Sequence, residues 1–222
     1  MRSGAGYVVL AGEGAGGNAA PHALIRRSAT DAGQLRGLLD DERIAVAVIG
    51  PGLGRDEQAG ARLDAALDAH CKLVIDADAL TMLAERGFDR LNGVSALPIL
   101  TPHHGEFTRL FGEGEGGKVD RAREAARRAG AIVVYKGNDT VIAAPDGRAA
   151  IAPPAPSWLA SAGTGDVLTG IVAARYAQVD DAFTAACQAV WLHGEAARRA
   201  GPDLIADDLL EALPATLAAC LA

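Results

Sequence analysis

The chain has 222 residues, of which 50% are hydrophobic and 22% are charged, so it is long enough to bury a core within one domain spanning residues 1–222. The formal net charge of -7 and the aromatic content of 4% argue against a nucleic-acid partner, which would require a basic surface and stacking rings. The three cysteines form no CxxC motif, no apolar run is as long as a membrane span, and no signal-peptide pattern occurs. These features predict a cytoplasmic protein with no membrane partner.

Short apolar runs alternate with helical patterns over the first 135 residues. The predicted strands are Tyr7–Ala11, Ile44–Ile49, Lys72–Asp76, Leu97–Leu100 and Ala131–Tyr135. The predicted helices between them are about Glu57–His70, Ala79–Glu85, Glu106–Phe111 and Val119–Ala129. Because the strands are almost continuously apolar, we expect a parallel sheet with helices on both faces, which is an α/β fold.

The pattern changes after Tyr135. The stretch "TVIAAPDGRAAIAP" predicts two short strands around the turn at Pro145–Gly147. Three helices are expected after it, over Gly163–Gln178, Asp181–Arg199 and Asp207–Leu221. No linker or repeat interrupts this order.

Polar or glycine-rich clusters follow four of the predicted strands. They are "GPGLG" at 50–54, "DAD" at 76–78, "TPHHGE" at 101–106 and "KGNDT" at 136–140. In open α/β sheets, ligands bind beyond the carboxyl ends of the strands. The four clusters therefore predict one shared site.

Two glycine-rich stretches resemble nucleotide-binding loops only superficially. "GEGEGGK" at Gly112–Lys118 has the spacing of a Walker A loop up to its lysine, but Val119 replaces the Ser or Thr that holds magnesium, and the preceding segment is predicted as a helix. "GEGAGG" at Gly12–Gly17 is followed by no helical pattern, so we interpret it as a loop.

The stretch "ASAGTGDVLTG" at 160–170 opens a predicted helix with glycines. Unpaired amides and the helix dipole at such a start attract anions, and glycine lets the backbone approach them closely. Asp166 could accept a proton from an attacking hydroxyl, or it could only complement the helix dipole. The flanking glycines Gly163 and Gly165 favour the chemical role.

The other candidates each have a structural alternative. Glu106 could orient water around Mg²⁺, or it could serve as a partner of the helix dipole. Lys136 could bind nucleotide phosphates, or it could be an exposed turn lysine. Of the two acids in "DADAL", Asp78 is expected to cap the next helix, and His193 in "WLHGEAA" is interpreted as a hydrogen-bonded core histidine.

In this order, the motifs resemble those of the ADP/ATP-dependent NAD(P)H-hydrate dehydratases of the ribokinase-like superfamily. The matching stretches lie between Ile44 and Arg199 and are "VIGPGLGRD", "LVIDADAL", "LPILTPHHGEFTRLFG", "VVYKGNDTVIAAPDG", "LASAGTGDVLTGIVAA" and "VWLHGEAA". The resemblance implies a three-layer α/β/α sandwich with a mostly parallel central sheet. It also implies repair of hydrated NADH or NADPH: ADP or ATP phosphorylates the added hydroxyl, and elimination of phosphate restores the reduced cofactor.

The resemblance also implies roles for individual residues. Asp166 would be the base, and Gly163, Thr164 and Gly165 would form the anion hole. Hydrated cofactor would contact Gly52, Gly54, His103 and Asp166. Nucleotide would contact Lys136, Gly137, Asn138, Asp139, Thr140 and Gly165, and Glu106 would serve Mg²⁺ through water.

Two departures from the family pattern bear on this interpretation. His104 replaces the proline of the family's "TPHPGE", where we expect a change in local stiffness only. The stretch "MRSGAGYVVLAG" is similar to the segment after the family's first strand–helix unit, so we expect that unit to be missing and a homo-oligomer to form.

Two alternatives to the dehydratase function are kept open. One is another ribokinase-like kinase, such as one acting on a thiamine-precursor alcohol, and the other is an inactive nucleotide-binding protein.

Overall fold

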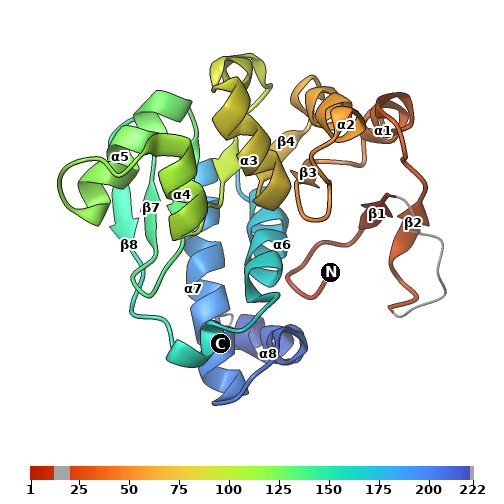
Figure 1. The fold of residues 1–222 in the computed structure, drawn as a ribbon. Helices are drawn as coiled ribbons and strands as arrows, with labels where there is room; N and C mark the ends of the chain where they lie inside the picture. Colours follow the sequence, from red (N-terminus) through yellow and green to blue (C-terminus); the bar gives the residue numbers. More distant parts are fainter. Residues whose placement is uncertain (13–20, 221–222) are drawn as a thin grey trace.

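The computed structural model describes residues 1–12 and 21–220, and it forms three layers with a sheet between two layers of helices (Figure 1). Apart from Gly12, the predicted loop at Gly12–Gly17 lies outside the described residues. The layered arrangement is the α/β fold predicted from the alternating strand and helix patterns.

The central sheet has six strands in the order β3-β4-β5-β6-β7-β8. The first four run parallel, and the last two form the predicted antiparallel hairpin. Their bounds are β3 Val46–Ile49, β4 Lys72–Ile75, β5 Ile99–Leu100, β6 Ile132–Tyr135, β7 Val141–Ala143 and β8 Ala149–Ile151. The sheet is therefore mostly parallel, as expected.

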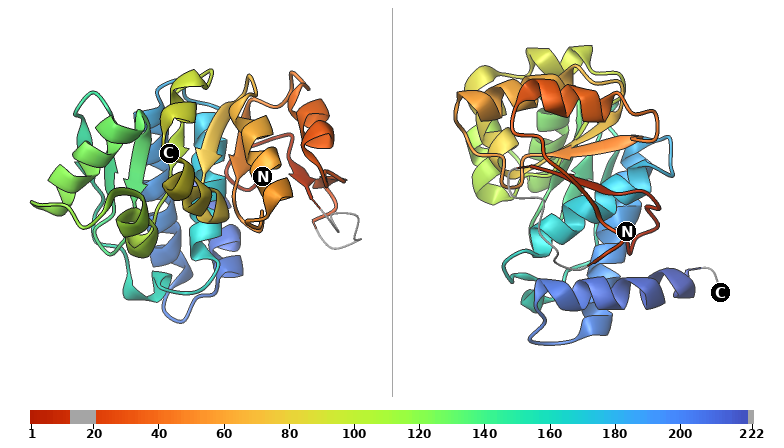
Figure 2. Two further views of the ribbon diagram at one scale, coloured as in Figure 1. Left: turned by 45° about the horizontal axis from the view of Figure 1, so that its top comes forward. Right: turned by 90° about the vertical axis from the view of Figure 1, so that its right-hand side faces the viewer.

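Helices cover both faces of this sheet (Figures 1 and 2). The core on one face includes residues of α2 to α5, and the core on the other face includes residues of α6 to α8. The helix bounds are α1 Ala32–Leu39, α2 Glu57–Leu67, α3 Ala77–Arg86, α4 His104–Phe111, α5 Lys118–Ala129, α6 Thr164–Tyr176, α7 Ala182–Ala200 and α8 Ala206–Ala219, with short 3-10 turns η1 Asp89–Gly93 and η2 Ser157–Leu159.

Strand β4 shows why its sequence is continuously apolar. Leu73 and Ile75 pack into the core beside α2 to α5, whereas Val74 packs into the core beside α6 and α7. Successive side chains of a strand point to opposite faces, so a sheet that is covered on both sides needs apolar residues at every position. All three side chains are almost fully buried.

The segment before β3 differs from the prediction. β1 (Val9–Ala11) does not join the central sheet but pairs in parallel with β2 (Ile25–Arg27) in a separate two-stranded sheet. β2 and α1 were not predicted, because β2 has the sequence "IRR" and α1 contains two glycines, which lower helix propensity. Asp31 was an available signal, since its side chain caps α1 by accepting a hydrogen bond from Gln34 N.

The ends of β3 and β4 approach so closely that only glycine fits at position 50. Gly50 is buried with a φ of 129°, and a Cβ atom there would lie 1.8 Å from the carbonyl oxygen of Asp76. The first glycine of "GPGLG" thus fixes the spacing between two strand ends that border the candidate site.

The substitution Gly50→Ala should lower the free energy of unfolding by at least about 2 kcal/mol, because it adds a steric overlap to a strained φ. Urea unfolding followed by circular dichroism measures the change. Gly37→Ala is the matched control, since Gly37 is exposed within α1 and open space surrounds it. That variant should gain up to about 1 kcal/mol from helix propensity. Wild-type stability of Gly50→Ala would contradict the close approach.

Candidate functional site

The four strand-end clusters meet in the structure. Gly54 N donates to Asp78 Oδ2 at 3.1 Å, which joins "GPGLG" to "DAD". Lys136 N donates to the carbonyl oxygen of Pro102 at 2.8 Å, and Lys136 Nζ donates to Asp76 Oδ1 at 3.1 Å. The clusters at 101–106 and 136–140 are therefore linked to each other and to the end of β4, as the shared-site prediction requires.

The N-terminus of α6 borders these clusters and has no side-chain cap. Gly163 occupies the N-cap position with a φ of 85°, in the left-handed region that favours glycine. No residue within the described ranges 1–12 and 21–220 accepts a hydrogen bond from the amides of Gly165 and Asp166. Two free amides at the positive end of a 13-residue helix form a site suited to an anion.

Asp166 is the third residue of α6 and is exposed. Its carboxylate forms no hydrogen bond or ion pair with any residue that the structure describes. The carboxylate is thus open to a ligand at the same helix start that presents the free amides.

Lys136 lies mostly inside the protein, so its interpretation as an exposed turn lysine is wrong. Its side chain is 17% exposed, and its ammonium group forms an ion pair with Asp76. A Cβ atom at Gly165 would lie 3.6 Å from Lys136 Nζ. The ammonium group is therefore held beside the first turn of α6.

Asp76, and not Asp78, caps α3. Asp76 is 2% exposed, occupies the N-cap position and accepts a hydrogen bond from Ala77 N at 2.9 Å. Asp78 instead accepts hydrogen bonds from Gly54 N and Arg55 Nε. The prediction failed because either acid can cap a helix, and the actual start of α3 at Ala77 lies two residues before the predicted one.

The segment "KGNDT" forms a tight turn at the end of β6. Thr140 Oγ1 donates to the carbonyl oxygen of Gly137 at 2.9 Å, and Ala155 N donates to the carbonyl oxygen of Asn138 at 3.1 Å. Asp139 Oδ1 pairs with Lys118 Nζ at 2.7 Å, and this hydrogen bond lowers the pKa of Asp139. Lys118, the lysine of the Walker-like stretch, is thus engaged in an ion pair, and its stretch follows helix α4 as predicted.

His103 and Glu106 form a capping box at the start of α4. His103 Nδ1 accepts from the amides of Gly105 and Glu106, and His103 N donates to Glu106 Oε2 at 2.8 Å. The other carboxylate oxygen of Glu106, Oε1, lies 3.6 Å from His103 Nε2.

Across the described part of the chain, no group of three or more His, Cys, Asp or Glu residues could hold a metal ion. A Mg²⁺ ion that is held mainly by phosphates and water is compatible with one carboxylate oxygen of Glu106.

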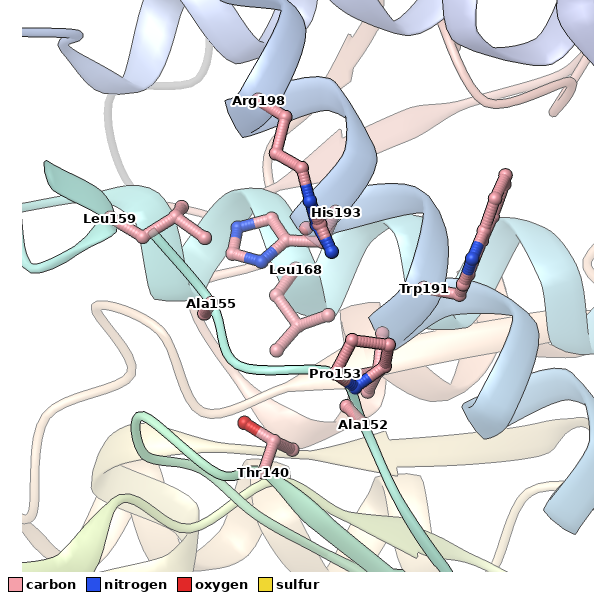
Figure 3. Close-up of a pocket in the computed structure, with 11 residues that line it drawn as sticks. Thr140, Ala152, Pro153, Ala155, Leu159, Leu168, Trp191, His193 and Arg198 are labelled. Carbon is pink, nitrogen blue, oxygen red and sulfur yellow. The ribbon is translucent and has the colours of Figure 1, made fainter. Parts of the chain in front are cut away.

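A pocket lies between the hairpin, the loop after β8 and α7 (Figure 3). Thr140 lines it from the hairpin, Ala155 and Leu159 line it from the loop, and His193 lines it from α7. The space, including the part open to solvent, is about 380 Å³. Through Thr140 the pocket adjoins the "KGNDT" turn.

His193 is hydrogen-bonded as expected, but it lines this pocket rather than the core. Its Nε2 lies 2.9 Å from the carbonyl oxygen of Thr164, so Nε2 carries the proton that is donated. The hydroxyl of Thr164 points into the preceding loop, where the carbonyl oxygens of Leu159 and Ser161 lie at 2.8 Å. Burial lowers the pKa of His193 to about 4, and the nearby charge of Lys136 acts in the same direction.

Sequence comparison places the chain in a known family. The profile of the NAD(P)H-hydrate dehydratase family matches residues 1–217. The chain belongs to the NAD(P)H-hydrate dehydratase family.

Among the described residues, none of the helices has both the length and the apolar composition that a membrane span requires.

Individual relatives agree with this family assignment. The bifunctional NAD(P)H-hydrate repair enzyme Nnr of Mycobacterium tuberculosis is 47% identical over 136 residues, which are 61% of this chain and 28% of that protein. The chain thus spans about a third of the length of such bifunctional relatives.

Solved structures confirm the ribokinase-like fold. The crystal structure of the ADP/ATP-dependent NAD(P)H-hydrate dehydratase from Bacillus subtilis, co-crystallised with ATP/Mg²⁺ and soaked with CoA, has a TM-score of 0.75 and 31% identity, and the match covers 88% of this chain and 73% of that one. A ribokinase-like superfamily protein of Enterococcus faecalis has a TM-score of 0.83 over 98% of this chain and 78% of its own, and its 24% identity shows the fold alone.

One departure from the dehydratase pattern has more effect than expected. His104, in the place of the usual proline, was expected to change local stiffness only. Its Nδ1 lies 2.6 Å from the hydroxyl of Tyr135, the residue before Lys136, and the two rings are stacked. His104 therefore adds a polar link between the start of α4 and the end of β6.

The stability of this dehydratase-family protein should fall as the pH is lowered from about 6.5 to 4. The unfolded chain binds a proton at His193 in this range, whereas the folded chain keeps the imidazole neutral, so stability rises with pH across the window. The full effect is about 3 kcal/mol. Urea unfolding at a series of pH values should show a flatter dependence for His193→Gln.

The exposed histidine His22 supplies the control for loss of an imidazole. His22→Gln should retain the wild-type dependence on pH. An equal slope for His193→Gln and the wild type would contradict the buried neutral state.

Proposed function

We propose that this protein uses ADP or ATP to dehydrate hydrated NADH or NADPH, with Asp166 as the general base at the start of α6. The support is the combination at that helix start: an unpaired Asp166 carboxylate, two free amides and the Lys136 ammonium group lie beside the shared strand-end site. The family assignment supports the same reaction.

The proposed reaction has two steps. Asp166 accepts the proton of the added hydroxyl as that oxygen forms a bond to the terminal phosphorus of the nucleotide, and the bond from phosphorus to the leaving nucleotide oxygen breaks. The C–O bond then breaks and its oxygen leaves as inorganic phosphate, while a proton on the neighbouring ring carbon passes to water and the C–H electron pair forms the double bond of the reduced nicotinamide. Phosphorylation thus converts hydroxyl, a poor leaving group, into phosphate, a good one.

The cradle for the transferred group is proposed to be Gly163, Thr164 and Gly165. Within this cradle the free donors are the amide of Gly165 and the adjoining amide of Asp166, together with the helix dipole, because both the amide and the hydroxyl of Thr164 are engaged in the preceding loop. Donors that are fixed before the reaction stabilise the charge that develops on the phosphoryl oxygens. This mode of binding requires no P-loop.

The nucleotide is proposed to lie along Lys136, Gly137, Asn138, Asp139, Thr140 and Gly165. The pocket beside Thr140 offers a partly apolar space next to this turn. Glu106 would hold Mg²⁺ through water, and the ion would neutralise charge on the nucleotide phosphates.

The hydrated cofactor is proposed to contact Gly52, Gly54 and His103 in addition to Asp166. Gly52 has a φ of 65° and open space around it, so its backbone is accessible to a ligand. The amide of Gly54 is already bonded to Asp78, which leaves close backbone approach as its contribution. A single domain, a cytoplasmic location and a homo-oligomeric state complete the proposal.

The proposed activity is tested by incubating the protein with NADH hydrate, Mg²⁺ and either ADP or ATP. Absorbance of NADH and inorganic phosphate should both appear. A stable phosphorylated product without phosphate release would instead indicate a small-molecule kinase. Thermal stabilisation by nucleotide without any turnover would indicate an inactive binding protein.

Asp166→Asn should lower kcat by roughly 10²- to 10⁴-fold while nucleotide affinity stays within a few-fold, because the amide keeps the shape but cannot accept the proton. Stopped assays of NADH formation and calorimetry with ADP measure the two quantities. Asp120→Asn is a matched control, since Asp120 is also the third residue of its helix, α5. A helix-dipole role alone would give both variants the same small loss of stability and retained turnover.

A further inference from the structure

Asp76 is a buried carboxylate that connects three separate parts of the candidate site. It is 2% exposed at the junction of β4 and α3. Lys136 from the end of β6 donates to Oδ1 at 3.1 Å, and Thr169 from α6 donates to Oδ2 at 2.5 Å. Ala77 N donates to Oδ1 at 2.9 Å. Both carboxylate oxygens are therefore bonded, and each reaches a different element of the site.

The backbone around Asp76 is held in an unusual conformation. Ala77, the next residue, has a φ of 49°, a value that residues with a side chain seldom adopt. On the other side, Gly50 is packed directly against the Asp76 carbonyl oxygen. Such strain persists only where the surrounding structure determines it, and it is concentrated at functional sites.

Lys136 needs this partner because a lysine side chain is long and flexible. The carboxylate of Asp76 takes one of the three donors of the ammonium group, which leaves two for other acceptors. The ammonium group stays beside Gly165, whose free amide opens the proposed phosphoryl cradle. Thr169 Oγ1 also lies 3.1 Å from the Gly165 carbonyl oxygen, so the same network touches the cradle backbone.

We infer that Asp76 is a positioning residue: its carboxylate holds the Lys136 ammonium group beside the first turn of α6, where the phosphoryl group is transferred. The catalytic part of this inference rests on the proposed function, whereas the contacts of Asp76 do not depend on it. Asp76 itself does not touch the substrate. It acts through Lys136, and Thr169 fixes its second oxygen.

A double-mutant cycle tests whether Asp76 acts through Lys136, and titration of the folded fraction separates this role from a loss of stability. Asp76→Asn should lower kcat/KM about 10- to 100-fold, because small displacements of a group at the reacting centre have effects of this size. Lys136→Met should lower it at least as much. In the Lys136→Met background, Asp76→Asn should change turnover less than about two-fold, since the group it positions is already absent. If the fold-losses in kcat/KM of the two single variants multiply in the double variant, the inference is overturned.

Active-site titration with Mg-ADP by calorimetry corrects each rate for the fraction of folded protein. Asp31→Asn is the control, because Asp31 also caps a helix, α1, but contacts no residue of the site. It should retain wild-type turnover. If Asp76→Asn does not fold, Thr169→Val and Thr169→Ser replace it: valine should lower kcat/KM, and serine, which keeps the hydroxyl, should restore it. Equal effects of valine and serine would overturn the inference.

Failure of the proposed reaction gives a different result from failure of this inference. If the wild-type protein does not convert NADH hydrate, the proposed function is wrong, and the cycle is measured on the dissociation constant of Mg-ADP instead. Asp76→Asn should then alter that constant in the wild-type background and leave it within two-fold in the Lys136→Met background. The same change in both backgrounds would overturn the positioning role.

Discussion

A carboxylate buried at the end of a parallel sheet must be paired, and the structure around Asp76 depends on this requirement. An unpaired buried charge is strongly destabilising, so its partners have to be held in place by the fold itself. Here the partners come from β6 and α6, and the close approach of Gly50 fixes the carbonyl side of the same residue. The arrangement that stabilises the strand ends is therefore also the arrangement that places a cation at the start of α6.

Most of the central fold could be predicted from the sequence because each signal was local. Continuous apolar runs marked β3 to β6, and the Pro-Asp-Gly turn marked the hairpin, with bounds correct to within a few residues. The segment before β3 was less predictable. β2 is three residues long with two arginines, and its only strand partner among the described residues is β1, so its conformation depends on that pairing rather than on its own pattern.

The candidate site was predictable in its location but not in its connections. Glycines and polar residues at strand ends identified the segments, because the topology of a parallel sheet brings such ends together. The partners of Asp76 lie 60 and 93 residues away in the sequence, and nothing in "DADAL" distinguishes the acid that pairs with Lys136 from the acid that pairs with Arg55. The hydrogen-bond partner of His193 was equally unpredictable, since the accepting carbonyl oxygen of Thr164 lies 29 residues away on another helix. Long-range polar pairing is a property of the packed structure.

In the proposed reaction, the charge balance at the start of α6 favours positioned donors over general electrostatic attraction. The chain carries a net charge of -7, and the ion pair of Asp76 with Lys136 adds no net charge next to the cradle. The attraction for an anion then comes from the free amides and dipole of α6, whose effect is confined to its first turn, and it has to exceed the repulsion by the Asp166 carboxylate in that turn. A lysine whose charge is balanced by a paired carboxylate contributes directed hydrogen bonds rather than a long-range potential. In a transfer reaction such directed donors stabilise the developing charge selectively, whereas general attraction would bind the substrate and the transition state equally.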